Sequence, residues 1–454
     1  MIVDRAEPLS TSRFLLFALF ALHAAGGGGC APSRPEAAAA GAAAPPGQAA
    51  PPVAPAGRPA AAPAFTKLVL AKRATNEVVG AMSQPRISPK WLTVTSGVPG
   101  GGGIPDAVKV FRKTSGGWAP SQDLLSDHPG DDFGFVTAIH GDTIAVGAPT
   151  RDVNGAGESG AVLIFDYDGS KWAHTATLTS PAPAAKSHFG SHVALDRGTV
   201  VVSEEPNSFG AGQLAPSRGV YVFAKEGGRW TPQATLHTPE ELTRAAYPAG
   251  GHGFGSYTKL DRDTLAVSAH MDRVFLYERE PGGRWQLRQR LDAVTDPNDS
   301  KDGPGFARSL DLEGDTLVVS SLRAAGLVPD AGAVIVYRRA GSLWRQEAKL
   351  VAPDGATRDM FGHWVAIDGG IIFAAAFRAS VEGHQEVGAT YAFRRVNGQW
   401  SMTAKLVPPD PAQQKFTGYE LDVAAGTAVL TGGPASNPES SDYVWLVNLA
   451  PLRP

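Results

Sequence analysis

Apolar and polar residues follow one another in short runs along most of this chain, and the runs recur with a long period. One unit shows the pattern through a half-apolar run, a Gly-Asp turn and three further apolar runs, at 133–139, 141–142, 144–149, 160–165 and 172–178. Alternation over a few residues is typical of a half-buried strand, and a tight turn with glycine joins strands as a hairpin. The unit therefore predicts four antiparallel strands.

The same unit recurs along the chain. Phenylalanines that start a unit stand at Phe133, Phe189, Phe254, Phe306, Phe361 and Phe416, and tryptophans near the end of a unit stand at Trp118, Trp172, Trp230, Trp285, Trp344 and Trp400. Successive tryptophans are 54, 58, 55, 59 and 56 residues apart. A period of this length predicts repetition of one supersecondary unit rather than a single enzyme core. We expect the tryptophans to pack each outer strand against the next blade.

The two ends of the repeat array predict how it closes. The last unit stops after 443–447, one strand short, while 65–70 matches the fourth-strand pattern of 348–350 and 404–406. If these ends pair, the ring has no exposed edge. The sequence thus predicts an all-β fold, a seven-bladed β-propeller of four-stranded antiparallel blades closed by an N-terminal strand. A six-bladed ring is the alternative, because the unit before Trp118 lacks the Phe-Gly start.

The Phe-Gly start and the Val-Gly-Ala-Pro segment at 146–149 resemble the FG-GAP repeat, the unit of the integrin alpha propeller and of many bacterial surface proteins. The resemblance covers roughly residues 64–448 and implies a seven-bladed propeller. Single copies are degenerate, since Phe306 is followed by Ala307 and Phe416 by Thr417. Integrin-like copies carry a calcium loop between their first and second strands. Here that place holds only a short turn, which cannot supply the six to eight oxygen ligands that calcium needs.

Acidic and amide side chains gather in other loops, between blades and between second and third strands. Both loop types emerge on one face of a propeller, because the strands alternate in direction. As partner-binding residues we select Asp152, Asn154, Glu158, Glu204, Glu205 and Asn207, and as a cation site the run of Asp296, Asn298, Asp299 and Asp302. The alternative is that these are solvated turn residues, which Asp and Asn favour in any case. We expect no cofactor, with calcium at the 296–302 run as the exception.

The N-terminal region predicts export. Arg5 and Arg13 precede a largely apolar run over 14–25, too short to span a bilayer but typical of a signal peptide. Cys30 is the single cysteine, and its place after small residues resembles the lipobox of bacterial lipoproteins. That resemblance implies lipidation of Cys30 and an outer-membrane anchor, with secretion as the alternative.

Four segments follow from this organisation. They are a signal peptide at 1–29, the lipidated cysteine with a disordered Ala/Pro/Gly-rich tether at 30–63, the propeller at 64–448 and a tail at 449–454. A tether of this composition cannot bury enough apolar surface to offset its ordering entropy.

No catalytic motif emerges from the repeats, and the net charge of -3 gives no reason to expect nucleic acid as a partner. Our leading hypothesis is therefore a non-enzymatic envelope lipoprotein with a monomeric head. Its only membrane contact would be the lipid anchor, and loops on one face would bind a protein or glycan, in adhesion or as a scaffold. One alternative is a glycan or ester hydrolase with paired carboxylates near the central channel. Another is a purely structural module.

Overall fold

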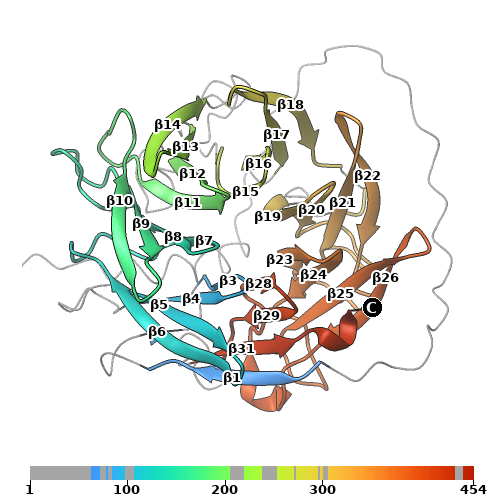
Figure 1. The fold of residues 1–454 in the computed structure, drawn as a ribbon. Helices are drawn as coiled ribbons and strands as arrows, with labels where there is room; N and C mark the ends of the chain where they lie inside the picture. Colours follow the sequence, from blue (N-terminus) through green and yellow to red (C-terminus); the bar gives the residue numbers. More distant parts are fainter. Residues whose placement is uncertain are drawn as a thin grey trace, which may run out of the picture.

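The computed structural model describes residues 63–71, 78–79, 84–97, 107–204, 219–237, 253–269, 272–294, 297–299, 305–434 and 443–453. Figure 1 shows their strands arranged as a ring of sheets. Seven sheets of four or more antiparallel strands make up the ring, which confirms the seven-bladed propeller. Within the described ranges, no helix is long and apolar enough to cross a membrane. The signal segment, Cys30 and the tether lie outside the described residues, so the predictions about them stay predictions.

The first three blades contain the following strands. Blade 1 has β2 (Val78–Val79), β3 (Arg86–Ile87), β4 (Trp91–Gly97), β5 (Ala107–Thr114) and β6 (Gly117–Leu125). Blade 2 has β7 (Thr137–His140), β8 (Thr143–Ala148), β9 (Ala161–Tyr167) and β10 (Trp172–Leu178). Blade 3 has β11 (Phe189–Asp196), β12 (Thr199–Glu204), β13 (Val220–Glu226) and β14 (Arg229–Leu236).

The other four blades continue the same order. Blade 4 has β15 (Thr258–Asp261), β16 (Thr264–Ala269), β17 (Arg273–Arg279) and β18 (Trp285–Asp292). Blade 5 has β19 (Phe306–Glu313), β20 (Thr316–Ser321), β21 (Ala333–Ala340) and β22 (Leu343–Leu350). Blade 6 has β23 (Phe361–Asp368), β24 (Ile371–Ala376), β25 (Ala389–Val396) and β26 (Gln399–Leu406). Blade 7 has β28 (Leu421–Ala424), β29 (Thr427–Leu430), β31 (Tyr443–Asn448) and β1 (Phe65–Val69).

A short ladder and two single-turn helices lie beside these blades. The ladder joins β27 (Gln414–Lys415) to β30 (Gly433–Pro434), and the 3-10 helices are η3 (Pro411–Gln413) and η4 (Ala450–Leu452).

Blade 7 joins the two ends of the repeat array. β1 pairs antiparallel with β31, from Phe65 opposite Val447 to Val69 opposite Tyr443. The sheet therefore gains its fourth strand from the N-terminal side, as the incomplete last unit predicts. This pairing covers the edge of β31 with hydrogen bonds that would otherwise be open to another chain.

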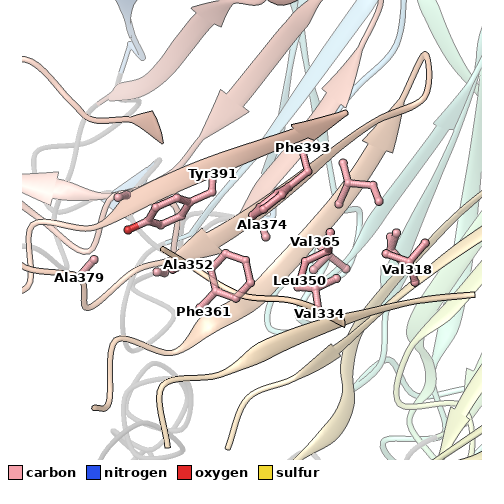
Figure 2. Packing of buried hydrophobic residues seen from close by; sticks show 14 of the residues in the cluster. Val318, Val334, Leu350, Ala352, Phe361, Val365, Ala374, Ala379, Tyr391 and Phe393 are labelled. Atoms are coloured by element: carbon pink, nitrogen blue, oxygen red, sulfur yellow. The ribbon is translucent and has the colours of Figure 1, made fainter. Parts of the chain in front are cut away.

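The hydrophobic core lies between the blades. Seven clusters of buried residues are found among the described residues, each built from two neighbouring blades. Figure 2 shows the cluster between blades 5 and 6, where Val334 and Leu350 pack near Phe361 and Tyr391. Second strands such as β20 and β24 are buried throughout, because a neighbouring blade covers each face. Outer strands alternate, since only one face is covered.

The tryptophans do pack between blades, but against the preceding blade rather than the next one that the sequence predicted. Trp172 of blade 2 lies 4.9 Å from Trp91 of blade 1, ring to ring. The side-chain amide of Gln122 on β6 donates to the Trp172 carbonyl and accepts from the Trp172 amide, at 3.0 and 2.9 Å. Gln289 on β18 bonds in the same way to Trp344 of the next blade. Each repeat thus carries its own connection to its neighbour.

The last residue of several first strands makes a second connection between blades. Asp196 accepts from the Arg262 amide at 2.7 Å, Asp261 from the Gly314 amide at 2.6 Å, and Glu313 from the amides of Gly369 and Gly370 at 2.8 Å. Each acceptor belongs to one blade and each donor to the turn of the next. We call these contacts the turn clamps.

Candidate functional site

The two faces of the propeller differ in the length of the segments that connect its strands. First and second strands are joined by tight turns, as between β7 and β8, and so are third and fourth strands. Longer segments join second to third strands, such as Ala148 to Ala161, and join one blade to the next. Because antiparallel strands alternate in direction, all the longer segments emerge on one face. We call it the loop face, and the opposite one the turn face.

Backbone hydrogen bonds join neighbouring loops on the loop face. The Lys186 amide donates to the Gly157 carbonyl at 2.9 Å, and the Arg358 amide donates to the Asp330 carbonyl at 2.9 Å. The Phe416 amide likewise donates to the Glu386 carbonyl at 2.8 Å. In each pair, one loop lies within a blade and the other leads to the next. At these three places, neighbouring loops of the described part of this face therefore support each other.

Three of the predicted partner-binding residues share one loop of this face. Asp152 accepts from the Glu158 amide at 2.8 Å through its Oδ1. Asn154 and Glu158 both have a φ of 53°, in the left-handed region that asparagine tolerates best. The Glu158 carboxylate lies 3.3 Å from Nε2 of the buried His188. Asp152 thus shapes the loop, while Asn154 and the half-exposed Glu158 carboxylate face outward from a fixed backbone.

The remaining predicted loop residues have different positions. Glu204 is fully buried and accepts from the Tyr221 hydroxyl at 2.9 Å, so it lies inside blade 3 and is not an exposed contact residue. The loop prediction fails there because β12 extends through Glu204. Glu205 and Asn207 lie outside the described residues.

Only half of the predicted cation run is described. Asn298 is exposed, and Asp299 accepts from the Ala325 amide at 2.8 Å, which joins two loops of blade 5. Asp296 and Asp302 lie outside the described residues. Where the structure is described, no group of three His, Cys, Asp or Glu side chains could hold a metal ion. The cation site therefore stays a prediction.

A charged network that the sequence did not single out lies between blades 1 and 2 on the loop face. Nη2 of Arg151 is 2.8 Å from the Asp127 carboxylate, and its Nη1 is 3.4 Å from Asp131. Hydrogen bonds from His128 and Arg151 lower the pKa of Asp127 to about 2. Burial instead raises the pKa of Asp131. Arg151 is itself buried, so it holds the loop at 127–131 rather than presenting a charge to solvent.

A second group of functional side chains surrounds the propeller axis. The first strand of each blade is the innermost one, so residues far apart in sequence meet there (Figure 1). Polar and aromatic side chains come from six blades and form what we call the axial cluster: Arg86, His192, Tyr257, Lys259, Arg308, Asp311, His363, Trp364, Tyr419, Glu420 and Asp422. Most follow a Phe-Gly start by two to five residues, a sequence signal that could have located them.

Aromatic rings and guanidinium groups alternate within the axial cluster. The Arg308 guanidinium lies 5.1 Å from the Tyr257 ring centre, and that of Arg86 lies 5.6 Å from the Trp364 ring centre. The two rings meet edge to face with their centres 5.9 Å apart. The His192 ring also packs against Tyr257, with the ring centres 5.0 Å apart. Cation–π contacts made by partly exposed guanidinium groups of this kind are worth roughly 0.5–2 kcal/mol each.

Three carboxyl groups complete the cluster, and each faces a different partner. Asp311 is 3.2 Å from the Lys259 ammonium group and also accepts from the Ile367 amide at 2.8 Å. Asp422 accepts from the Ile87 amide at 2.9 Å. Glu420 has its closest charged neighbour in Arg86, at 4.0 Å. Asp311 and Asp422 therefore connect blades, whereas Glu420 has no such backbone bond.

Burial controls ionisation in this cluster. It raises the pKa of Glu420 to about 8, against the opposing effects of Arg86 and Arg308. It also raises the pKa of Asp422 and lowers that of His363 well below its ordinary value. His363 is thus neutral at pH 7, and its Nδ1 donates to the Tyr419 carbonyl at 3.0 Å. At that pH the buried Glu420 carboxyl is largely protonated.

Comparison with known proteins supports the repeat assignment. The FG-GAP repeat family matches residues 126–165 and 344–393. The chain is therefore a seven-bladed β-propeller that carries FG-GAP repeats, a combination that suggests a protein-binding or structural role. No curated protein matches the chain by sequence.

Several solved structures resemble the chain. The β-propeller domain of Cps50 (Swd1) from Myceliophteria thermophila has a TM-score of 0.49 at 11% identity, covering 84% of this chain and 99% of that one. A protein from Lactobacillus plantarum has a TM-score of 0.43 at 13% identity, covering 71% and 84%. Sqt1 from Saccharomyces cerevisiae has a TM-score of 0.41 at 11% identity, covering 79% and 81%.

Proposed function

We propose that this protein is a non-enzymatic binding module of the cell envelope. Its monomeric propeller binds a protein or glycan through the loop face, and a lipid on Cys30 anchors it by the tether that follows. The observation that supports this proposal is the asymmetry of the two faces: every long connection among the described strands lies on one side. Variable loops on a rigid scaffold are a common location of binding residues.

Exposed apolar side chains on the loop face add support. Val294 is 63% exposed and Leu327 is 60% exposed, although most large apolar residues of the described chain are buried. Both belong to the segments that Asp299 joins through its bond to the Ala325 amide. Large apolar side chains held outward by ordered backbone are typical contact residues of protein interfaces.

Site-specific photo-crosslinking in the native host tests the proposal. A photoreactive amino acid replaces Leu327 in the full-length protein, and a matched variant carries it at Val396, which is 47% exposed at a tight turn of the turn face. We expect a discrete adduct from position 327 and none from 396. Equal labelling from both positions, or none from either, would reject the loop face as the binding surface.

The N-terminus is tested separately. Mass spectrometry of the mature protein from the membrane fraction should find a diacylated or triacylated Cys30. An unmodified terminus in the soluble fraction would replace the anchored form with a secreted one.

A hydrolase is the second candidate function, and one observation favours it. Glu420 lies just before β28 and Asp422 lies on it, and burial raises the pKa of both, as a general acid requires. Against it, Asp422 already bonds the Ile87 amide. Turnover of a glycan or ester that Glu420→Gln abolishes would establish the hydrolase in place of the binding module.

A further inference from the structure

Two groups in the axial cluster lack a hydrogen-bond partner despite being buried. Glu420 is 2% exposed, and its Oε2 accepts no hydrogen bond. Nη1 of Arg308 is buried and donates none. A buried polar group without a partner destabilises the fold unless a further partner satisfies it. Arg308 is close enough to Glu420 to influence its pKa. A guanidinium donor and a carboxyl oxygen left open in one cluster therefore point to an occupant.

The charged neighbours do not satisfy these two groups. Arg86 is 4.0 Å from Glu420, too far for a hydrogen bond, and it donates instead to the Pro85 carbonyl and the Gln84 side chain at 2.8 and 3.2 Å. Arg308 lies over the Tyr257 ring, and among the described residues no carboxylate forms an ion pair with it. Lys259 is paired with Asp311. Within the axial cluster, the open positions thus belong to Arg308 and Glu420.

We infer that Arg308 and Glu420 bind a small carboxylate anion at the propeller axis. One oxygen of the ligand accepts from Nη1 of Arg308, and the ligand also accepts from the protonated carboxyl group of Glu420. Both bonds are charge-assisted and therefore stronger than neutral ones. The guanidinium supplies the positive charge that the anion requires. Binding makes and breaks no covalent bond.

The surroundings restrict the ligand in size and allow it to enter. Tyr257 and Trp364 lie 5.9 Å apart, and their faces are covered by arginines, so no large ring can stack there. Lys259 has a side chain that is 35% exposed, and Arg308 and Tyr257 are partly exposed. Solvent therefore reaches the cluster, and a molecule the size of acetate fits the chemistry better than a sugar.

Ionisation of Glu420 makes this binding depend on pH. Its pKa of about 8 keeps the proton in place at neutral pH, and above that value two carboxylates would face each other. The charged groups around Glu420 are Arg86 from β3, Arg308 from β19 and Asp422 from the adjoining strand β28. His363 from β23 adds no charge, because burial lowers its pKa. Affinity should thus be constant below pH 7 and fall about tenfold by pH 9.

Titration calorimetry with sodium acetate tests the inference on the full-length protein, with sodium chloride at equal ionic strength as the comparison. We expect acetate to bind at pH 6.5, chloride to bind at least tenfold more weakly, and acetate affinity to fall about tenfold at pH 9. Equal affinity for the two anions, or no binding of acetate at pH 6.5, would overturn the inference.

Three variants assign the effect to residues. Arg308→Gln should abolish acetate binding, and Arg284→Gln, whose side chain is 72% exposed on an outer turn, should leave it unchanged. Glu420→Gln retains a donor that never ionises, so it should bind acetate equally at pH 6.5 and 9. If Arg308→Gln does not fold, the pH dependence of acetate binding by Glu420→Gln still tests the inference. A tenfold loss of acetate affinity between pH 6.5 and 9 in that variant would contradict the role of Glu420.

Discussion

The backbone conformation of one residue explains why the repeats begin with Phe-Gly. Glycines after the starting phenylalanine have positive φ angles, 96° at Gly190 and 86° at Gly362, where L-residues are strained. Ala307 adopts the same conformation at 65° and is the exception. The glycine that precedes a third strand is as constrained, because a neighbouring blade touches it. A Cβ on Gly332 would lie 2.2 Å from the Phe361 carbonyl oxygen of blade 6.

This contact predicts a large effect for a single methyl group. Gly332→Ala should lower the free energy of unfolding by about 3 kcal/mol, because it combines strain at φ 93° with a clash against backbone. Gly141→Ala is the control, since it has a φ of 59° with open space around it, and should cost only about 1 kcal/mol. Urea denaturation of both variants measures the difference. Equal costs would show that the blades do not touch as described.

The start of the last repeat shows where the Phe-Gly pattern fails as a signal. The sequence places the last unit's start at Phe416, but Thr417 occupies the position of the other phenylalanines: its amide bonds the Val387 carbonyl at 2.9 Å, as Phe361 bonds Ala331. Gly418 then takes the positive φ of 84°. The aromatic residue is a weaker signal than the glycine, because packing tolerates a threonine while the backbone requires φ above zero.

At the scale of the strand, the turn clamps explain why acidic residues end the first strands. Burial raises the pKa of Asp196, but hydrogen bonds from His140 and the Arg262 amide outweigh it and lower the pKa below the ordinary 3.8. The folded-state pKa is thus below the unfolded one. The clamp therefore stabilises the protein above pH 3.8, and the contribution is lost as pH falls through the folded pKa.

Asp196→Asn should accordingly cost about 1 kcal/mol of unfolding free energy at pH 7, because the charge and the His140 contact are lost while one acceptor remains. The cost should be smaller at pH 2.5, which lies below the ordinary pKa of 3.8. Asp315→Asn, at the exposed turn of blade 5, provides the control and should cost nothing at either pH. Denaturant midpoints at both pH values check this, and a cost independent of pH would contradict the lowered pKa.

The ring was predictable from the repeats, with six blades as the alternative to seven, whereas the contacts within the axial cluster were not. Strand order and closure follow from local runs whose period is visible in the sequence. Arg86 and Trp364 contact each other only because blades 1 and 6 both face the axis, and no local pattern encodes that distance. The sequence suggested paired carboxylates near the axis without naming them. Only the assembled ring identifies Glu420 and Asp422.

Closure by β1 is the feature on which the ring as a unit depends. A chain that begins after residue 71 loses five paired residues and the buried side chain of Leu70. We expect its unfolding free energy to drop by about 3 kcal/mol or more and the open edge of β31 to cause self-association. Thermal unfolding and light scattering measure both. A chain that begins at residue 63 keeps β1 and should behave like the full-length protein; a stable monomer without β1 would contradict closure.

The pairing of β1 with β31 also determines when the ring can close during biosynthesis. Phe65 and Val447 pair across about 380 residues, so β1 is among the first strands to be made, while its partner is among the last. At roughly 5–20 residues per second, β1 waits some 20–75 seconds for β31. Six blades can assemble during that interval, but the seventh cannot. A nascent chain therefore carries an unsatisfied first strand through nearly all of its translation, which gives holding chaperones a defined segment and a defined period in which to act.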